Sequence, residues 1–90
     1  MKYIAKYKSP NYNSRKNSKI KLIIIHYTAL KNIEEAIYYL CNKEKKVSSH
    51  YLISQNGSVY HLVEDKFRAW HAGEGFWQEI TDINSVSIGI

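Results

Sequence analysis

The 90-residue chain contains one cysteine, one proline and no long apolar run. The single cysteine, Cys41, cannot form a disulfide within the chain, and this fits a reducing compartment. No apolar run approaches the length of a membrane-spanning helix, and residues 1–12 lack the apolar core of a secretory signal. We therefore expect a cytoplasmic protein without a membrane span.

Acidic residues are absent from positions 1–21, where all the charged side chains are lysine or arginine. Such a basic arm can bind nucleic acid, and binding of that kind weakens steeply with salt. Tyrosines and the proline interrupt the basic residues, however, which favours a solvated arm without a nucleic-acid partner. Residues 1–19 show no sustained period, so we expect an irregular arm lying over one small domain formed by residues 20–90.

The most informative stretch is Lys21–Thr28, KLIIIHYT. Its four consecutive aliphatic residues predict a short strand that is covered on both faces. His26 follows at once, where the edge of such a sheet opens to solvent. Neutral imidazole is a common zinc ligand and also transfers protons near neutral pH. The alternative is a histidine that only ends the strand.

A helix is predicted after this strand. Asn32 is a suitable N-cap, and Glu35 three positions later completes a pattern like a capping box. The apolar residues that follow fall on one helical face, and this indicates packing against a core. They are Ile33, Ala36, Ile37, Leu40 and Cys41. Burial in that face explains Cys41 better than a catalytic role does.

A β-hairpin is predicted around Asn56-Gly57, the dipeptide preferred in two-residue type I′ turns. If Gln55 faces Ser58, then His50 and His61 become diagonal neighbours on one face. Two histidines placed in this way could hold a metal ion. The alternative is one buried histidine bonded to backbone and one half-exposed partner.

The last third of the chain contains a loop and an apolar segment. Residues 69–77 combine aromatic side chains with two glycines, a composition that suits either a ligand-binding loop or an aromatic plug over the core. Alternating apolar residues at 86, 88 and 90 predict the start of a strand. That pattern stops at the last residue, so the strand looks interrupted.

Five blocks in this order resemble the zinc-dependent N-acetylmuramoyl-L-alanine amidases, the type related to phage lysozyme-like amidases and peptidoglycan recognition proteins. The blocks are IIIHYTA (23–29), VSSHYLIS (47–54), GSVY with LVED after it (57–65), RAWHAG (68–73) and INSVSIGI (83–90). SPNYNSR, before the first strand, is similar to the lead-in of the bacterial branch. The resemblance implies an α/β fold, a mixed sheet flanked by helices, with a zinc-floored groove that binds peptidoglycan or a muropeptide.

The resemblance also implies roles for single residues. His26 matches a zinc ligand of the family, whereas His50 matches a structural or groove-wall position. We expect substrate contacts from residues near the groove: Tyr27, His71, Ala72, Gly73, Trp77 and Asn84. The function implied is hydrolysis of the amide between N-acetylmuramic acid and L-alanine in the bacterial cell wall.

One part of the family pattern does not occur within these 90 residues. The general-base glutamate follows the SIGI sequence directly in the family, which places it one residue after Ile90, and the other two zinc ligands come later still. We therefore expect a domain that is incomplete at its C-terminus, with little or no amidase activity alone. Alternative functions are a non-catalytic muropeptide-binding module and an inactive fragment of such an enzyme.

Overall fold

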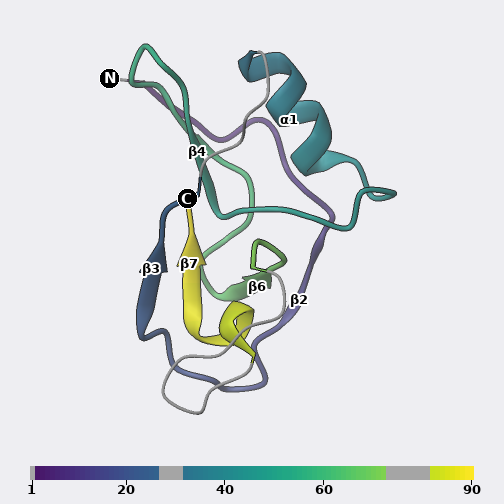
Figure 1. Cartoon of the computed structure of the whole chain (residues 1–90), viewed down its shortest axis with the longest axis vertical. Helices are drawn as coiled ribbons and strands as arrows, with labels where there is room; N and C mark the ends of the chain where they lie inside the picture. The colour runs from purple at the N-terminus through teal and green to yellow at the C-terminus, as the bar shows by residue number, and fades with distance from the viewer. Residues whose placement is uncertain (1, 27–31, 73–81) are drawn as a thin grey trace.

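The computed structural model describes residues 2–26, 32–72 and 82–90 (Figure 1). These residues form short strands, one α-helix and one 3₁₀ helix. In chain order they are β1 (Tyr3–Ile4), β2 (Tyr12–Ser14), β3 (Leu22–Ile24), α1 (Ile33–Cys41), β4 (Tyr51–Ile53), β5 (Val59–His61), β6 (Phe67–Ala69), η1 (Ile83–Val86) and β7 (Ser87–Gly89). Among the described helices, none combines the length and apolarity that crossing a bilayer requires.

The strands pair in three small sheets of mixed direction. One has the order β1-β5-β4, with β1 parallel and β4 antiparallel to β5. β2 pairs antiparallel with β6, and β3 pairs parallel with β7. A bond of 3.0 Å from His50 N to Gly89 O joins the start of the hairpin to β7. The predicted α/β fold is therefore confirmed, although its sheet consists of three linked pieces.

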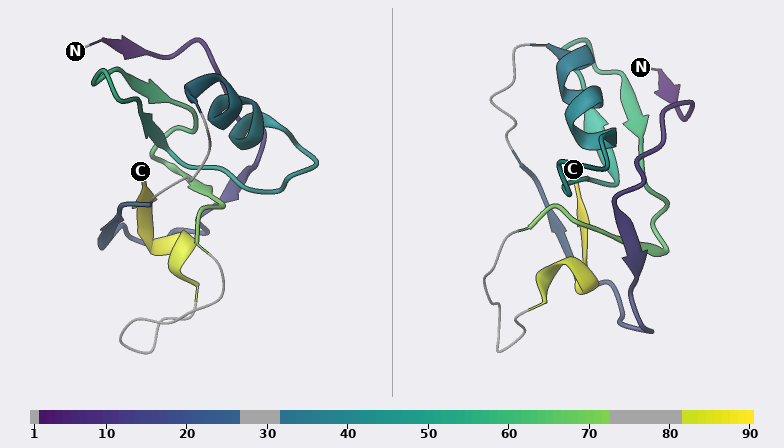
Figure 2. Two further views of the ribbon diagram at one scale, coloured as in Figure 1. Left: turned by 45° about the horizontal axis from the view of Figure 1, so that its top comes forward. Right: turned by 90° about the vertical axis from the view of Figure 1, so that its right-hand side faces the viewer.

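Helix α1 begins and packs as its sequence predicts. The Asn32 side chain accepts a hydrogen bond of 2.8 Å from Glu35 N, which satisfies one of the free amides of the first turn. Ala36 is buried against Leu52 and Leu62 of the hairpin region, and the helix lies beside that hairpin (Figure 2). Cys41 is half-buried next to this core, and its burial raises the pKa of the thiol.

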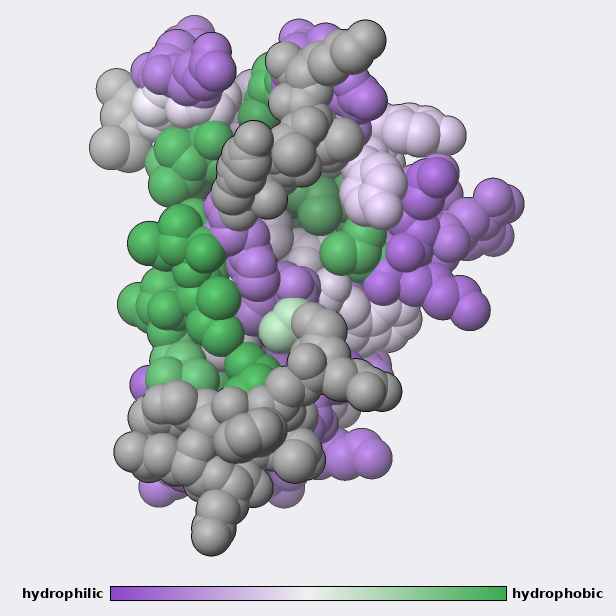
Figure 3. Space-filling model, viewed as in Figure 1, coloured by the Kyte–Doolittle hydropathy of each residue, from purple (hydrophilic) through white to green (hydrophobic). Residues whose placement is uncertain are grey.

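The prediction that residues 21–26 form a strand covered on both faces is wrong. Leu22 and Ile24 are half-buried, whereas Ile23 and Ile25 are 68% and 79% exposed. Only one face of β3 packs against the rest of the described chain, and successive side chains of a strand point to opposite faces. Figure 3 shows apolar side chains gathered at this edge of the molecule.

The hairpin forms at the predicted place, but its predicted register is wrong by one residue. Tyr51 pairs with His61 and Ile53 with Val59, so Leu52 faces Tyr60. The turn uses three loop residues rather than two, because only Gly57 has a positive φ, +87°, and Ser54 N bonds Ser58 O at 3.0 Å. A three-residue loop that ends in a left-handed glycine is the next commonest hairpin connection.

Residues 2–19 are more regular than expected. β1 adds to the hairpin sheet, and β2 pairs with β6. Ser9, Asn11 and Arg15 from this segment are buried, and Asn11 Nδ2 donates to the carbonyl of Val47 at 2.9 Å. The segment is thus built into the fold, while its separation from the domain at residue 19 stays a prediction.

Candidate functional site

The parallel ladder of β3 and β7 places His26 at the end of the sheet. Ile90 N donates to Ile24 O at 2.9 Å, and His26 N donates to Ile90 O at 2.8 Å. Both ends of this ladder segment are therefore bonded, so the backbone of His26 is held while its side chain is exposed. A histidine at this place can be aimed at a ligand.

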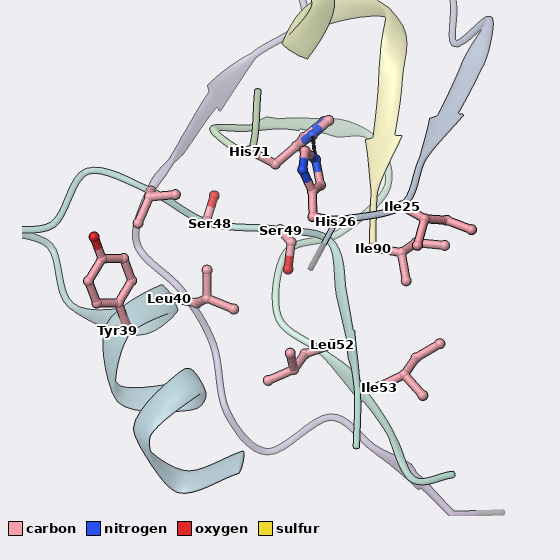
Figure 4. Close-up of a pocket in the computed structure, with 11 residues that line it drawn as sticks. Ile25, His26, Tyr39, Leu40, Ser48, Ser49, Leu52, Ile53, His71 and Ile90 are labelled. Carbon is pink, nitrogen blue, oxygen red and sulfur yellow. Dashed lines mark hydrogen bonds between the residues drawn. The ribbon is translucent and has the colours of Figure 1, made fainter. Parts of the chain in front are cut away.

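The His26 ring lines a cavity of about 540 Å³. Figure 4 shows His26 and His71 at one end of the cavity and side chains of α1 and the hairpin around the remainder. The other lining residues are mostly apolar: Ile25, Tyr39, Leu40, Val47, Ser48, Ser49, Leu52, Ile53, His71 and Ile90. A concave, mainly apolar wall with a few polar groups at one end is typical of small-molecule sites.

His71 lies directly against His26. Its Nδ1 is 2.8 Å from His26 Nε2, and the two rings meet edge to face with centroids 5.0 Å apart. On its other side, His71 Nε2 is 2.9 Å from Ser87 Oγ. Burial is the main cause that lowers the pKa of His71 to about 4, and the neighbouring His26, His50 and arginines lower it further. His71 is therefore neutral at neutral pH.

Gly89 makes room for the His71 ring. A Cβ atom at this position would lie 2.3 Å from Cγ of His71 and 2.5 Å from its Cδ2. Real Cβ atoms do not approach other atoms so closely, so a side chain here would displace the imidazole. The glycine of SIGI is thus explained by the His71 ring, which packs against the strand at this position.

Asn84 binds the segment that carries His71. Its Oδ1 accepts hydrogen bonds from His71 N at 3.1 Å and Ala72 N at 2.8 Å, and its Nδ2 donates to Ala72 O at 3.3 Å. The amide thereby uses both of its polar atoms on this backbone. The predicted contact of Asn84, His71 and Ala72 with a substrate stays a prediction, and the structure adds a bracing role for Asn84.

His50 lies in the interior, with no exposed surface. Gly89 N donates to its Nδ1 at 3.1 Å, so Nε2 carries the proton and donates to Phe67 O at 2.8 Å. Burial, above all, lowers the pKa of His50, and the nearby Arg15 adds to the effect. His50 thus braces β7 from behind and does not reach the cavity surface.

Arg15 is a structural residue that the sequence reasoning missed. It is 6% exposed, and its guanidinium donates to the carbonyls of Asp65, Asn84, Ser85 and Ser87 at 2.8–3.2 Å. The arginine fork offers five donors in a fixed plane, which a lysine cannot replace. One signal was present: Arg15 is the single arginine among the lysines of the basic arm.

His61 lies on the other face of the hairpin from His50, contrary to the predicted pairing. It stacks on Tyr51 with ring centroids 4.4 Å apart, and its Nε2 is 3.3 Å from Asp65 Oδ1. The one-residue difference in register moves His61 to the opposite face, because side chains alternate along a strand. A metal site shared by His50 and His61 is therefore excluded.

The described residues supply one candidate ligand of a zinc site. His26 supplies an exposed imidazole of the right donor type, but catalytic zinc needs three protein ligands. Within residues 2–26, 32–72 and 82–90, no three His, Cys, Asp or Glu side chains are grouped to hold a metal ion. The predicted contacts of Tyr27, Gly73 and Trp77 lie outside these residues.

Comparison with known proteins identifies the family. The family model described as N-acetylmuramoyl-L-alanine amidase (Amidase_2) matches residues 16–90. The chain is 39% identical over 79 residues to the N-acetylmuramoyl-L-alanine amidase AmiD of Escherichia coli K12, covering 80% of this chain and 28% of that protein. It is 31% identical over 100 residues to the 1,6-anhydro-N-acetylmuramyl-L-alanine amidase AmpD of Haemophilus influenzae, covering 91% and 54%.

A solved structure agrees with the fold. The crystal structure of a selenomethionine AmpD derivative superposes with a TM-score of 0.80 at 24% identity, covering 98% of this chain and 57% of that one. The chain thus spans about half the length, or less, of these relatives. With a family model that matches most of its residues, this chain belongs to the N-acetylmuramoyl-L-alanine amidase family.

Proposed function

We propose that this chain supplies part of the active site of a peptidoglycan amidase, which hydrolyses the amide between N-acetylmuramic acid and L-alanine. The observation that carries this proposal is the position of His26, the residue that matches a zinc ligand of the family, at the end of the cavity. Family membership and the two amidase relatives support the reaction class.

The β3–β7 register also fits the proposal. Leu22 pairs with Ser87 and Ile24 with Gly89, so a residue that continued β7 past Ile90 in the same register would be the ladder partner of His26. Paired residues of neighbouring strands lie about 5 Å apart and point to the same face. A glutamate placed there, where the family has its general base, would stand beside His26 and within reach of a water molecule at the cavity.

We propose zinc as the cofactor and His26 as one of its ligands. Bound zinc would supply a water of lowered pKa and polarise the amide carbonyl. The chain's own contribution is to hold the His26 ring in place, to keep His71 neutral beside it, and to present an apolar wall to the substrate.

A chimera tests this function. The part of the Haemophilus influenzae AmpD that follows its matched region is joined after Ile90, and zinc-dependent peptide release is measured from muropeptides with and without a 1,6-anhydro sugar. We expect the chimera to be active and the 90-residue chain alone to be inactive. His26→Ala should reduce activity more than about 100-fold, because even second-shell partners of a metal contribute 10–100-fold.

His61→Gln is the matched control, since it removes an imidazole on the opposite face of the hairpin. It should leave the activity of the chimera within about twofold, an effect expected of a residue away from the site. A folded, zinc-loaded chimera without activity, or an active His26→Ala chimera, would contradict the proposal.

A non-catalytic muropeptide-binding module is the second candidate. The observation that favours it is the cavity itself, which the described residues form without three metal ligands. Binding of a muramyl peptide by the 90-residue chain that survives a chelator and weakens in Trp77→Ala would support the module. Binding that is lost with the chelator would support the zinc enzyme.

A further inference from the structure

The hydrogen bonds around His71 determine where each proton lies. Ser87 Oγ is 2.7 Å from the carbonyl oxygen of Ile83. Two oxygens at this distance need a proton between them, and a carbonyl has none to give. The single hydroxyl proton of Ser87 is therefore used on Ile83, and the hydroxyl can only accept from any other partner.

That partner is His71. Its Nε2 lies 2.9 Å from Ser87 Oγ, so Nε2 must carry the proton of this bond. A neutral imidazole has only one N–H, and Nδ1 of His71 consequently keeps a lone pair. The Nδ1 atom is 2.8 Å from His26 Nε2, and the proton of that second bond must come from His26.

We propose that His71 is a positioning residue, which fixes the ring orientation and the tautomer of His26 through a relay that starts at Ser87. In this relay His26 donates from Nε2 to Nδ1 of His71, and His71 donates from Nε2 to Ser87. Within the described residues no hydrogen bond uses Nδ1 of His26, so this nitrogen keeps the lone pair to which a cation would bind.

Two further features of the structure support the relay. Gly89 leaves room for the His71 ring against β7, and Asn84 bonds the backbone amide of His71 at 3.1 Å. The His71 ring therefore packs against β7, and the backbone of His71 is bonded by Asn84, before any ligand binds. Metal-binding histidines commonly donate their second ring N–H to such a partner, which sets the tautomer and orientation of the ligand.

The test uses the 90-residue chain without metal. In a sample labelled with nitrogen-15, scalar coupling across the His26–His71 hydrogen bond is detected by NMR at pH 7.5. We expect the shared proton to be bonded to Nε2 of His26 and coupled to Nδ1 of His71. A proton bonded to His71 Nδ1, or no coupling between the two rings, would overturn the inference.

Variants then test the direction of the relay. Ser87→Ala should weaken the coupling and speed the exchange of the His26 ring proton at least about fivefold, the effect of one ordinary hydrogen bond. Ser85→Ala is the matched control, because its hydroxyl bonds Asp82 and Arg68 instead of His71, and it should leave the coupling unchanged. An unchanged spectrum in folded Ser87→Ala would also overturn the inference.

This role for His71 rests on the proposed function for its importance in catalysis, but its test does not. The coupling is measured without zinc and without substrate, and the wild-type measurement decides even if Ser87→Ala does not fold. If the coupling is found and the amidase chimera is inactive, the proposed function fails while the relay stands. If the coupling is missing in the 90-residue chain and the amidase chimera is active, only the relay fails.

Discussion

Gly89→Ala is the substitution that most sharply tests how the site is packed. The new Cβ would lie 2.3 Å from Cγ of His71, so one of the two groups must move. The strand cannot easily move, because His50 bonds both backbone polar atoms of Gly89. Gly89 N donates to Nδ1 of His50 at 3.1 Å, and His50 N donates to Gly89 O at 3.0 Å. The His71 ring should therefore be displaced.

The cost of this displacement can be estimated from its parts. Overpacking a well-packed site costs about 1–3 kcal/mol. Losing the bonds of His71 to His26 and Ser87 adds about 1 kcal/mol for each bond that is not replaced by water. Because His26 is exposed and water can replace its bond, we expect Gly89→Ala to lower the free energy of unfolding by about 2–4 kcal/mol.

Urea denaturation followed by circular dichroism measures this change, and histidine NMR signals report the displacement. Gly57→Ala is the matched control, because no atom lies within 4 Å of its added Cβ and only its φ of +87° is unfavourable. It should cost about 1 kcal/mol and leave the signals of His26 and His71 in place. Gly89→Ala with unchanged stability and unchanged histidine signals would refute the packing argument.

Three further predictions concern the fold around the site. Leu62→Ala, in the buried core, should lower the free energy of unfolding by about 2–5 kcal/mol, whereas Ile23→Thr on the exposed face of β3 should change it by less than about 0.5 kcal/mol; urea titrations of both variants check this. Arg15→Lys should lower the free energy of unfolding by about 2–4 kcal/mol, because buried carbonyls lose their donors, whereas Lys16→Ala should leave it unchanged. Thermal unfolding measures this contrast, and equal stabilities of the two variants would contradict it. Burial lowers the pKa of His50 in the folded protein, so at a pH below its usual pKa of 6.5 the unfolded state binds more protons at this residue than the folded state does. The free energy of unfolding should therefore fall as pH drops below about 6.5. Denaturation between pH 5 and 8 measures this dependence, and a free energy of unfolding that rises towards pH 5 would contradict it.

Local patterns in the sequence predicted the elements better than their packing. The start of α1 followed from Asn32 and Glu35, because a cap is set by residues three positions apart. The hairpin was also found from Asn56-Gly57, yet the same dipeptide fits a two-residue and a three-residue turn. Only the φ of each loop residue distinguishes these turns, and this single difference separated His50 from His61.

The features that the sequence did not predict depend on contacts between residues far apart in the chain. The resemblance pointed to His26 and His71, but their contact depends on a ladder between residues about 65 positions apart and on a glycine at position 89. The burial of Arg15 likewise needs four carbonyls from segments that are distant in the sequence. The apolar run of β3 indicated burial on two faces, although the described chain covers one.

A zinc titration followed by histidine NMR tests the central claim most directly. The four histidines lie in different surroundings: His26 is exposed at the cavity, His71 is bonded behind it, His50 is buried, and His61 is stacked on Tyr51. Zinc added to the 90-residue chain should shift the signals of His26 first, through its Nδ1, and His26→Ala should abolish this response. Zinc-induced shifts at His50 or His61 with His26 unaffected would contradict the account.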